Sequence, residues 1–387
     1  MKTGIGLPEE YVDRVQKCSE CGFCQAVCPV FEATLRPAYN TRGKMMILKE
    51  ILEGNLELSE KVGEAFYACT ACQACIDGYP SNVRASEIVQ AARKILFKEG
   101  FAPGHLLGVR DSVCTRGNVF GSEGEERVDI YPPALREKAK NGLLKEKAGT
   151  LLFMGCLPSY MDMKIVPAFL QAMDAAQVDY TTLSTKETCC GFPLYLMGSQ
   201  EFDAHAEKVV DGLKKTGARE LVTPCAGCYK TFKTLYPDLE NIGMRVLHSI
   251  QYMDELLRDG RIRFTGEIPK RITYHDPCDL GRACKILEEP RNILRSIPGI
   301  DYVEMKRNRL DARCCGGGGG MQATNPDLAV KMAAERVRDA FAVGAEILVS
   351  GCPACKDNLR KGMQSIPKKE REKLKIMDMG EVVSSAL

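Results

Sequence analysis

"ELVTPCAGCYKTF", residues 220–232, joins a short apolar run to a C-x-x-C pair, and "EILVSGCPACKDN", residues 346–358, repeats this arrangement. Two further stretches also recur: "TLLFMGCLPSY" (150–160) as "RITYHDPCDLG" (271–281), and "KETCCGFP" (186–193) as "DARCCGGG" (311–318). Matching cysteines are 122 residues apart at Cys156 and Cys278, and 127 apart at Cys225 and Cys352. A repeat at a nearly constant offset indicates two homologous halves that follow each other in the chain.

Each half of this repeat has the pattern of an α/β domain. Short apolar runs precede the cysteines, and amphipathic stretches such as "AVKMAAERVRDAFAVG" (329–344) follow them. A strand, a cysteine loop and a helix in this order place the cysteines at the carboxyl ends of parallel strands. We therefore expect two tandem α/β lobes, residues 148–268 and 269–387, related by a pseudo-twofold axis with their sites facing inward.

The first hundred residues have a different pattern. "CSECGFCQAVCP", residues 18–29, is a complete C-x2-C-x2-C-x3-C-P run, which is typical of cubane iron–sulfur clusters. "CTACQACIDGYP", residues 69–80, repeats it with Tyr79 in place of the fourth cysteine. The residues between the runs have helical rather than alternating periodicity, and Ser59 and Ser86 are candidate helix caps. We expect an α-helical ferredoxin-type domain over residues 1–104, an irregular linker over 105–147, and an α+β chain overall.

Composition excludes several classes of function. Of 387 residues, 45% are hydrophobic and 27% are charged, as in globular proteins, and the net charge of +2 gives no electrostatic case for nucleic acid. No apolar stretch approaches the roughly 20 residues that cross a bilayer. The N-terminus has no apolar signal region either. We expect a cytoplasmic protein with no membrane span.

The chain has nineteen cysteines, and seventeen of them fall into four spaced sets. Because no export signal is present, thiolate ligands for metal are a better explanation than disulfides. Zinc is the alternative, but zinc takes four ligands, usually as two pairs, whereas cysteines at every third position are typical of iron–sulfur clusters. The predicted ligands are Cys18, Cys21, Cys24, Cys28, Cys69, Cys72, Cys75, Cys156, Cys189, Cys190, Cys225, Cys228, Cys278, Cys314, Cys315, Cys352 and Cys355.

In two-cluster ferredoxins the fourth cysteine of each run ligates the cluster of the other run. Cys28 therefore completes a [4Fe–4S] cubane with the second run, and Tyr79 leaves the first run one ligand short. The first run would hold a [3Fe–4S] centre, or a cubane completed by Asp77, Cys114, water or a partner's residue. Alternatively, no cluster forms there and Tyr79 only packs. The complete set is Cys28, Cys69, Cys72 and Cys75, and the incomplete set is Cys18, Cys21 and Cys24.

Each lobe carries one cysteine, an adjacent pair and a C-x-x-C pair, in that order. Five thiolates exceed the usual number at zinc and suit a larger cluster in which irons share sulfur ligands. The five-cysteine sets are Cys156, Cys189, Cys190, Cys225 and Cys228 in the first lobe, and Cys278, Cys314, Cys315, Cys352 and Cys355 in the second.

The spacing C-x31–39-C-C-G followed by C-x-x-C resembles the CCG domain of heterodisulfide reductases. "TPCAGCYKTF", "YHDPCDLGR", "RCCGGGGG" and "CPACKDNL" carry this resemblance. A ferredoxin domain fused to two CCG domains resembles the family of heterodisulfide reductase D subunits, which includes a related component of class II benzoyl-CoA reductase complexes. The resemblance implies a noncubane [4Fe–4S] cluster on each five-cysteine set, with both clusters facing one substrate site and the N-terminal cubanes feeding them.

The same resemblance implies a function. The chain would be an iron–sulfur oxidoreductase subunit of an anaerobic, flavin-based electron-bifurcating complex, paired with a flavin-containing heterodisulfide reductase A-like protein. Disulfide reduction would take place between the lobes, on the clusters themselves. The alternatives are a pure electron relay in an acyl- or benzoyl-CoA reductase or a 2-hydroxy acid dehydrogenase complex, and a zinc scaffold.

Two features near the cysteines need separate interpretation. "CCGGGGGMQAT", residues 314–324, lacks the Gly-Lys-Ser/Thr ending of a phosphate-binding loop. Gly191 and Gly316, which follow the cysteine pairs, are instead expected to bring backbone N–H groups close to cluster sulfides. His275, in "YHDPC", is a candidate donor or proton source near the second-lobe cluster, or a residue that fixes its own loop.

Overall fold

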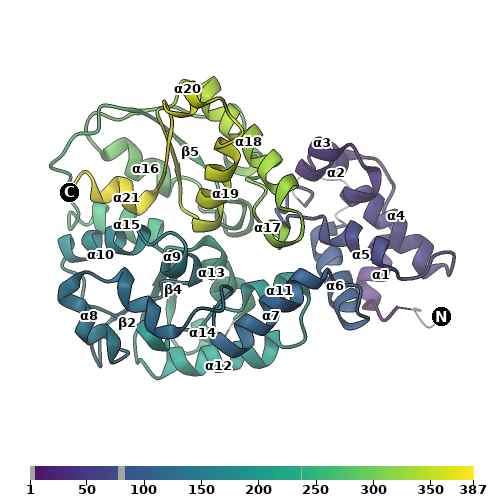
Figure 1. The fold of residues 1–387 in the computed structure, drawn as a ribbon, viewed down its shortest axis with the longest axis horizontal. Coiled ribbons are helices and arrows are strands. Elements are labelled where there is room, and N and C mark those ends of the chain that lie inside the picture. The colour runs from purple at the N-terminus through teal and green to yellow at the C-terminus, as the bar shows by residue number, and fades with distance from the viewer. Residues whose placement is uncertain (1–4, 77–82, 237) are drawn as a thin grey trace.

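A computed structural model describes residues 5–76, 83–236 and 238–387. Figure 1 shows a helical N-terminal domain on one side and two sheet-containing lobes on the other. The three parts touch one another, because α11 (Phe192–Met197) of the first lobe packs on α6 (Ala85–Lys98), and α18 (Pro326–Ala342) of the second lobe packs on α3 (Pro29–Thr34). Among the described residues, no helix has both the length and the apolar character needed to cross a bilayer.

The described residues of the N-terminal domain form helices and no strands, as the sequence predicts. Its core is built from apolar residues at helical spacing, such as Met45 and Leu48, and from Phe66 and Ile88. Ser59 caps α5 as expected, but Ser86 caps nothing, because α6 already begins at Ala85. The helices are α1 (Glu9–Gln16), α2 (Phe23–Ala26), α3, η1 (Pro37–Tyr39), α4 (Thr41–Leu52), α5 (Glu60–Tyr67) and α6.

Residues 105–147 are more ordered than the predicted irregular linker. They contain most of α7 (Gly104–Arg116), together with η2 (Gly124–Ile130) and α8 (Pro133–Lys140). Leu106 and Val113, two turns apart on α7, are both buried. Arg127, 1% exposed, donates from Nη1 to Glu187 Oε1 at 2.6 Å and to Ser159 Oγ at 2.7 Å. This buried pairing fastens the segment to the first lobe, which an irregular linker would not do. The domain boundaries themselves stay predictions.

The two lobes are parallel α/β sheets with the same strand order, which confirms the predicted fold class. The first sheet runs β2-β1-β3-β4 and the second β6-β5-β7-β8, with parallel pairing throughout. Their inner strands are buried along nearly their whole length, as in sheets covered on both faces. The strands are β1 (Thr150–Leu152), β2 (Tyr180–Thr182), β3 (Glu220–Thr223), β4 (Arg245–His248), β5 (Arg271–His275), β6 (Asp301–Tyr302), β7 (Ile347–Ser350) and β8 (Lys375–Asp378).

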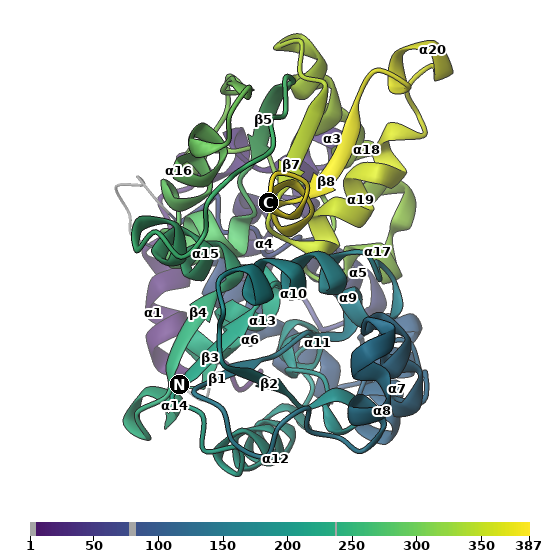
Figure 2. The ribbon, with the colours of Figure 1, turned by 90° about the vertical axis from the view of Figure 1, so that its left-hand side faces the viewer.

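The lobes pack on each other through helices at matching positions. Helix α10 (Ile165–Ala175) of the first lobe lies on α21 (Met379–Ser384), and α16 (Glu289–Ser296) of the second lies on α15 (Ser249–Arg258) (Figure 2). Each contact joins the last helix of one lobe to the long helix after the first strand of the other. The reciprocal packing supports the predicted pseudo-twofold axis, which stays a prediction.

Candidate functional site

The N-terminal cysteines form two groups. Cys28 lines one pocket together with the three cysteines of the second run, beside Thr41 and Lys44. The fourth cysteine of one run therefore lies with the other run, as the crossed pattern predicts. Burial raises the pKa of Cys28 to about 11, so its thiolate needs a neighbouring positive charge such as a metal. The cysteines of this pocket are Cys28, Cys69, Cys72 and Cys75.

The other pocket holds the three remaining cysteines of the first run, with Arg42 and Cys75 in its wall. Asp77 and Tyr79, the residues that bear on its fourth ligand, lie outside the described residues. Cys114 is exposed on α7, close to Arg110 and to Glu201 of the first lobe, and is not part of this pocket. Cys114 therefore does not line this pocket, and its assignment as the fourth ligand stays a prediction. The cysteines of this pocket are Cys18, Cys21 and Cys24.

In the first lobe, five buried cysteines meet at the carboxyl ends of β1 and β3. The Cys156 thiol contacts Cys189, and Cys190 contacts Cys228. Gly191 has φ +80°, and a methyl group on it would lie 3.0 Å from the His205 ring. The left-handed backbone conformation and the nearby ring both require a glycine at position 191. The expected approach of its backbone N–H to a cluster stays a prediction. The full set is Cys156, Cys189, Cys190, Cys225 and Cys228.

The second lobe gathers its five cysteines in the same way. Cys315 Sγ lies 3.2 Å from Cys355 Sγ, and the Cys314 thiol contacts Cys278. The backbone N–H of Gly316 donates to Cys314 Sγ at 3.3 Å, and that of Gly317 donates to Cys315 Sγ at 3.4 Å. Backbone donors to ligating sulfurs are the contacts expected around iron–sulfur clusters. The set is Cys278, Cys314, Cys315, Cys352 and Cys355.

The second lobe and the N-terminal domain meet directly at their cysteines. The Cys314 thiol hydrogen-bonds the sulfur of Cys72, and this contact lowers the pKa of Cys72 to about 5. Arg282 Nε donates to the carbonyl oxygen of Cys72 at 2.7 Å, and Arg282 Nη1 donates to that of Ala312 at 2.7 Å. One buried guanidinium therefore holds the two cysteine loops together.

The glycine run of the second lobe is the surface on which the loop at Cys69 and Thr70 rests. A methyl group on Gly319 would lie 2.1 Å from the carbonyl oxygen of Cys69, and one on Gly318 would lie 2.6 Å from that of Thr70. Arg93 donates to the carbonyl oxygens of Gly319 at 3.1 Å and Cys69 at 2.7 Å. These glycines therefore allow one backbone to approach another, a role that sequence reasoning missed although the run itself was the signal.

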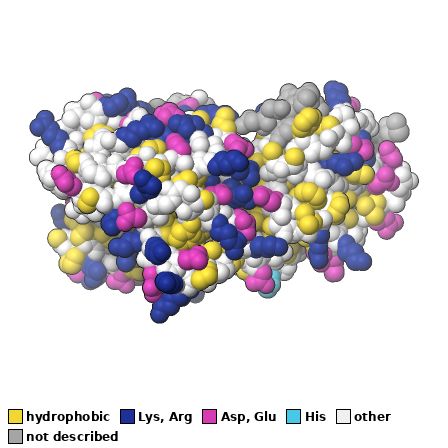
Figure 3. Space-filling view, turned by 90° about the horizontal axis from the view of Figure 1, so that it is seen from above, with side chains coloured by type: hydrophobic (Ala, Val, Ile, Leu, Met, Phe, Trp, Pro, Cys, Tyr) yellow, Lys and Arg dark blue, Asp and Glu magenta, His cyan; other side chains and the backbone are white. Residues whose placement is uncertain are grey.

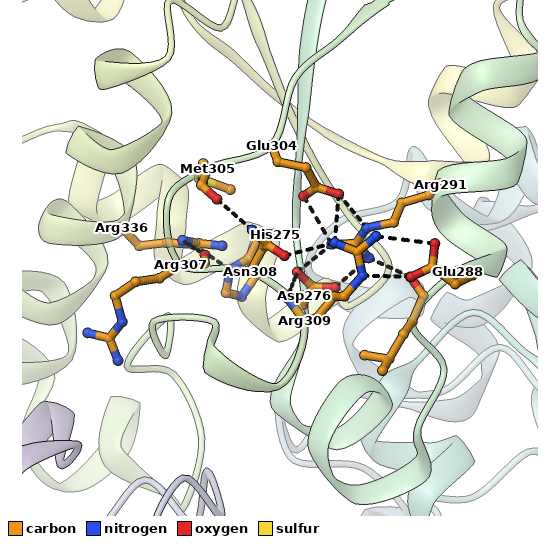
Figure 4. Close-up of polar contacts among 11 residues, drawn as sticks. His275, Asp276, Glu288, Arg291, Glu304, Met305, Arg307, Asn308, Arg309 and Arg336 are labelled. Atoms are coloured by element: carbon orange, nitrogen blue, oxygen red, sulfur yellow. Dashed lines mark hydrogen bonds and ion pairs between the residues drawn. The ribbon is translucent and has the colours of Figure 1, made fainter.

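His275 lies beside the second-lobe cysteines and is 1% exposed. A ring nitrogen lies within 4.8 Å of the sulfur atoms of Cys315 and Cys355. Arg336 Nε donates to His275 Nδ1 at 3.1 Å, and Figure 4 shows the two side chains meeting. The next residue, Asp276, makes a two-bond ion pair with Arg291 at 2.8 and 3.0 Å (Figure 4). Sequence reasoning found the histidine but neither arginine.

A cavity of about 390 Å³ lies between the lobes. All five first-lobe cysteines line it, whereas Cys352 is its only lining cysteine from the described residues of the second lobe. Cys352 lies close enough to Cys225 for their charges to interact. Side chains of α7 and Phe120 form another wall. The first-lobe set thus faces the cavity, and the second-lobe set lies behind it, against the N-terminal domain.

Figure 3 shows one face of the molecule, on which charged side chains of both signs are mixed. The face in Figure 3 carries Lys and Arg side chains interspersed with Asp and Glu, so no field of a single sign extends over it. A face on which charges of both signs alternate gives no electrostatic attraction for a charged polymer such as nucleic acid.

Comparisons with known proteins agree with this geometry. The cysteine-rich domain family CCG matches residues 150–233 and 272–360, and the 4Fe–4S dicluster domain family matches residues 14–83. The chain is 32% identical over 96% of its length to the D subunit of the dihydromethanophenazine:CoB–CoM heterodisulfide reductase of Methanosarcina barkeri, covering 93% of that protein. The D subunit of the Methanosarcina mazei enzyme is 31% identical over 96% of the chain and 94% of that protein.

A more distant relative is named for another activity. The B subunit of the CoM/CoB fumarate reductase of Methanothermobacter marburgensis is 26% identical over 98% of the chain and 74% of that protein. The cysteine sets, the two CCG matches and the dicluster match together define an iron–sulfur oxidoreductase subunit. The chain belongs to the family of heterodisulfide reductase D subunits.

Proposed function

We propose that this protein conducts electrons from its N-terminal domain to the second lobe, then to the first lobe, and delivers them in pairs to a substrate in the inter-lobe cavity. The observation that carries the proposal is the contact of Cys72 with Cys314, neither of which lines the cavity. Each cysteine set then neighbours the next, through Cys75 in the wall of the first-run pocket, Cys72 beside Cys314, and Cys352 near Cys225. The relatives, which are subunits of reductases, support this role.

The donor sets of the two lobes fit iron–sulfur clusters because nine of their ten thiols are buried, the thiols lie in contact with one another, and backbone N–H groups donate to sulfurs of the second lobe. We infer a [4Fe–4S] cubane on the set completed by Cys28, a [3Fe–4S] or incompletely ligated cluster on the set of Cys18, and noncubane [4Fe–4S] clusters on the two lobe sets. Clusters bound there would supply one-electron oxidation and reduction at sulfur-ligated iron. The catalytic group would be such a cluster, and His275 would act beside the second-lobe cluster.

Buried arginines hold the N-terminal domain against the second lobe and exclude water from this contact. Arg93, fully buried, bridges the loop of Cys69 to Gly319, and Arg282 bridges Cys72 to Ala312. Fixed donors to backbone carbonyls prevent the two cysteine loops from separating. Because the contact excludes water, an electron crosses between groups whose surroundings change little.

Electrons would enter at the first run. Cys21 is the exposed cysteine of its set, and Phe23, two residues further along the chain, is 55% exposed. An exposed aromatic ring beside a redox site is typical of a docking surface for a partner protein. The partner we infer is a flavin-containing heterodisulfide reductase A-like protein in an anaerobic, electron-bifurcating complex, because the chain has no flavin or nicotinamide motif of its own.

The reaction we infer is reduction of a disulfide, in which two electrons and two protons break one S–S bond and form two thiols. Anaerobically purified protein, reduced with a low-potential dye and freed of it, should be reoxidised by a low-molecular-weight disulfide, followed by visible absorbance and by quantifying the thiols released. If disulfides leave the clusters reduced while a partner flavoprotein reoxidises them, the chain is a relay and the reductase proposal is wrong.

The incomplete set has its own test. Tyr79→Cys supplies the missing thiolate, so a three-iron EPR signal in the oxidised protein should be replaced by a four-iron signal in the reduced protein. Iron and sulfide analysis should rise by about one iron per chain. An unchanged spectrum would contradict the three-iron assignment.

A further inference from the structure

We propose that His275 donates a hydrogen bond to a ligating sulfur of the second lobe and thereby raises the reduction potential of the cluster on that set. It is a positioning residue, because it acts on the cluster through a cysteine. The ring is buried at the end of β5, and one of its nitrogens lies within 4.8 Å of the sulfur atoms of Cys315 and Cys355. The inference rests on the proposed function only in requiring a cluster on this set, and it is independent of the substrate.

The tautomer of the His275 ring is fixed by its neighbour on α18. Because a guanidinium cannot accept a hydrogen bond, Arg336 Nε must donate to His275 Nδ1, at 3.1 Å (Figure 4). Nδ1 therefore presents its lone pair to the arginine, and the ring proton is on Nε2. Arg336 is fully buried and is itself held, since its Nη1 donates to the carbonyl oxygen of Arg307 at 2.8 Å and to Asp339 Oδ2 at 3.2 Å.

The protonated nitrogen of the ring needs an acceptor. His275 Nε2 is buried and makes no hydrogen bond to any described residue. Buried N–H groups are rarely left without a partner, and the sulfur atoms of Cys315 and Cys355 lie within reach. A nitrogen that carries a proton has no lone pair with which to ligate iron. The ring is therefore placed to donate to a ligating sulfur rather than to bind the metal.

The first lobe has a phenylalanine at the corresponding position. His275 stands three residues before Cys278, and Phe153 stands three residues before Cys156. The strand registers of the two sheets give the same correspondence. The Phe153 ring packs edge-on against Phe232, with the ring centroids 4.8 Å apart, and it has no N–H group to donate.

The first lobe does have a histidine beside its cysteines, but this ring makes a different contact. His205 Nε2 lies 2.7 Å from the carbonyl oxygen of Cys189. Because a carbonyl oxygen can only accept, the ring N–H of His205 is used by the backbone. The two lobes thus differ at the position of His275 by one N–H donor to a ligating sulfur.

This difference changes how electrons are distributed between the lobes. A donor to sulfur stabilises a cluster more strongly after reduction, when the sulfur ligands carry more negative charge. His275 therefore raises the potential of the second-lobe cluster above the value that it would have without the histidine. On the proposed electron path, the first of two electrons would reside in the second lobe, beside Cys72, until a second electron arrives. This bias would favour delivery of electrons in pairs.

Potentiometric EPR titration of the anaerobic holoprotein tests this role without relying on turnover. His275→Phe, which copies the first lobe, should lower the second-lobe potential so that its one-electron equilibrium shifts about tenfold, or about 59 mV. His275→Gln keeps an N–H donor near the place of Nε2 and should restore part of the shift. Phe153→Leu is the control at the corresponding position and should leave the second-lobe potential unchanged.

A second measurement detects the hydrogen bond itself in the wild-type protein, so it does not depend on the folding of a variant. When the four histidines of the chain are labelled with the heavy isotope of nitrogen, pulsed EPR of the reduced second-lobe cluster should show a weak coupling to that isotope. The coupling should be lost in His275→Phe. A wild-type spectrum without this coupling would overturn the hydrogen bond.

The remaining outcomes separate this inference from the proposed function. If the folded His275→Phe protein titrates like the wild type, or if His275→Gln lowers the potential as far as His275→Phe does, the histidine only fixes its own loop. If the second-lobe set holds no cluster, both the inference and the cluster assignment are wrong. If disulfides fail to reoxidise the protein but the potentials shift as expected, the proposed reaction is wrong and the role of His275 stands.

Discussion

The two lobes share one strand order and one cysteine pattern, but the loops after their cysteine pairs differ. In the first lobe Gly191 is followed by Phe192 and Pro193, which start α11 and line the cavity. In the second lobe Gly316 is followed by four more glycines, and the N-terminal domain rests on them. Both loops line the cavity, but only a loop without side chains, as at Gly318 and Gly319, lets another backbone approach this closely. The same α/β scaffold thus supports two different loop structures after its cysteine pair.

The lobes also differ in the source of one buried cation, and removing it should have the largest effect. Arg127, from the segment before the first lobe, pairs with Glu187, which accepts the N–H groups of Met154 and Gly155. In the second lobe Arg291 of α16 pairs with Asp276.

Arg127→Leu and Arg291→Leu should each lower the free energy of unfolding by about 3–5 kcal/mol, because a carboxylate is left buried and unpaired. Urea titration under argon measures the loss. Arg127→Leu combined with Glu187→Leu should recover much of it. If the free energy of unfolding falls only slightly in either single variant, the carboxylate left without its arginine must be solvated by water.

The glycine run provides the next test. Gly319→Ala forces a methyl group against the carbonyl oxygen of Cys69 at a position with φ +66°, so the N-terminal domain must shift. We expect a loss of about 2–3 kcal/mol in the free energy of unfolding and slower electron transfer into the lobes, measured by stopped-flow reduction. Gly212→Ala, within α12 (Phe202–Lys214) of the first lobe with nothing within 4 Å, is the control and should gain about 0.5–1 kcal/mol. Two equal losses would contradict the close approach.

The last strand of each lobe ends in a cap with the opposite pH response. Burial raises the pKa of Asp378 to about 7 and lowers the pKa of His248 to about 3. Between about pH 4 and 7, Asp378 is protonated in the folded protein but ionised in the unfolded chain. The free energy of unfolding therefore decreases as the pH rises through this range, by at most about 1.4 kcal/mol per pH unit. His248 stays neutral in the folded protein at pH values where it is protonated in the unfolded chain. The free energy of unfolding therefore decreases as the pH falls from about 6.5 to 3.

Asp378→Asn keeps the cap on Gly380 and should flatten the first slope, and His248→Asn should flatten the second. Urea midpoints across pH 4 to 8 distinguish the two variants. If the pH dependence of the urea midpoint is unchanged in Asp378→Asn or in His248→Asn, another buried group causes that pH dependence.

The smallest effect is expected at Cys114. This thiol is exposed and belongs to none of the four sets, so Cys114→Ser should change the free energy of unfolding by less than about 0.5 kcal/mol. Iron content and EPR spectra should match the wild type. A loss of iron would instead identify Cys114 as a ligand.

Much of this structure could be predicted from the sequence because its signals are local. The repeat around Cys156 and Cys278 predicts two α/β lobes, and the lack of strand periodicity predicts the helical N-terminal domain. The crossing of Cys28 follows from the two runs. The segment 105–147 was missed because Arg127 anchors it through Glu187, sixty residues away, and no local pattern encodes that pairing.

The arrangement of the site was less accessible. The sequence places cysteines at strand ends, but it does not say which set faces the cavity and which faces Cys72. That difference depends on where the N-terminal domain packs, and this is decided by Arg93 and Arg282 through carbonyl oxygens that carry no sequence signature. The glycine run could have suggested a close approach of backbones, although not the identity of the partner.

The contact of the loop at Cys69 with the glycine run also determines when this loop becomes enclosed during synthesis of the chain. Arg93 and Gly319, which hydrogen-bond in the folded protein, are 226 residues apart in the chain. As the chain leaves the ribosome, the N-terminal domain is complete while the surface that will cover Cys72 does not yet exist. The Cys72 side chain is therefore accessible early in synthesis and enclosed late. Nascent chains stalled before residue 311 should be alkylated at Cys72 by iodoacetamide, and finished chains should be protected.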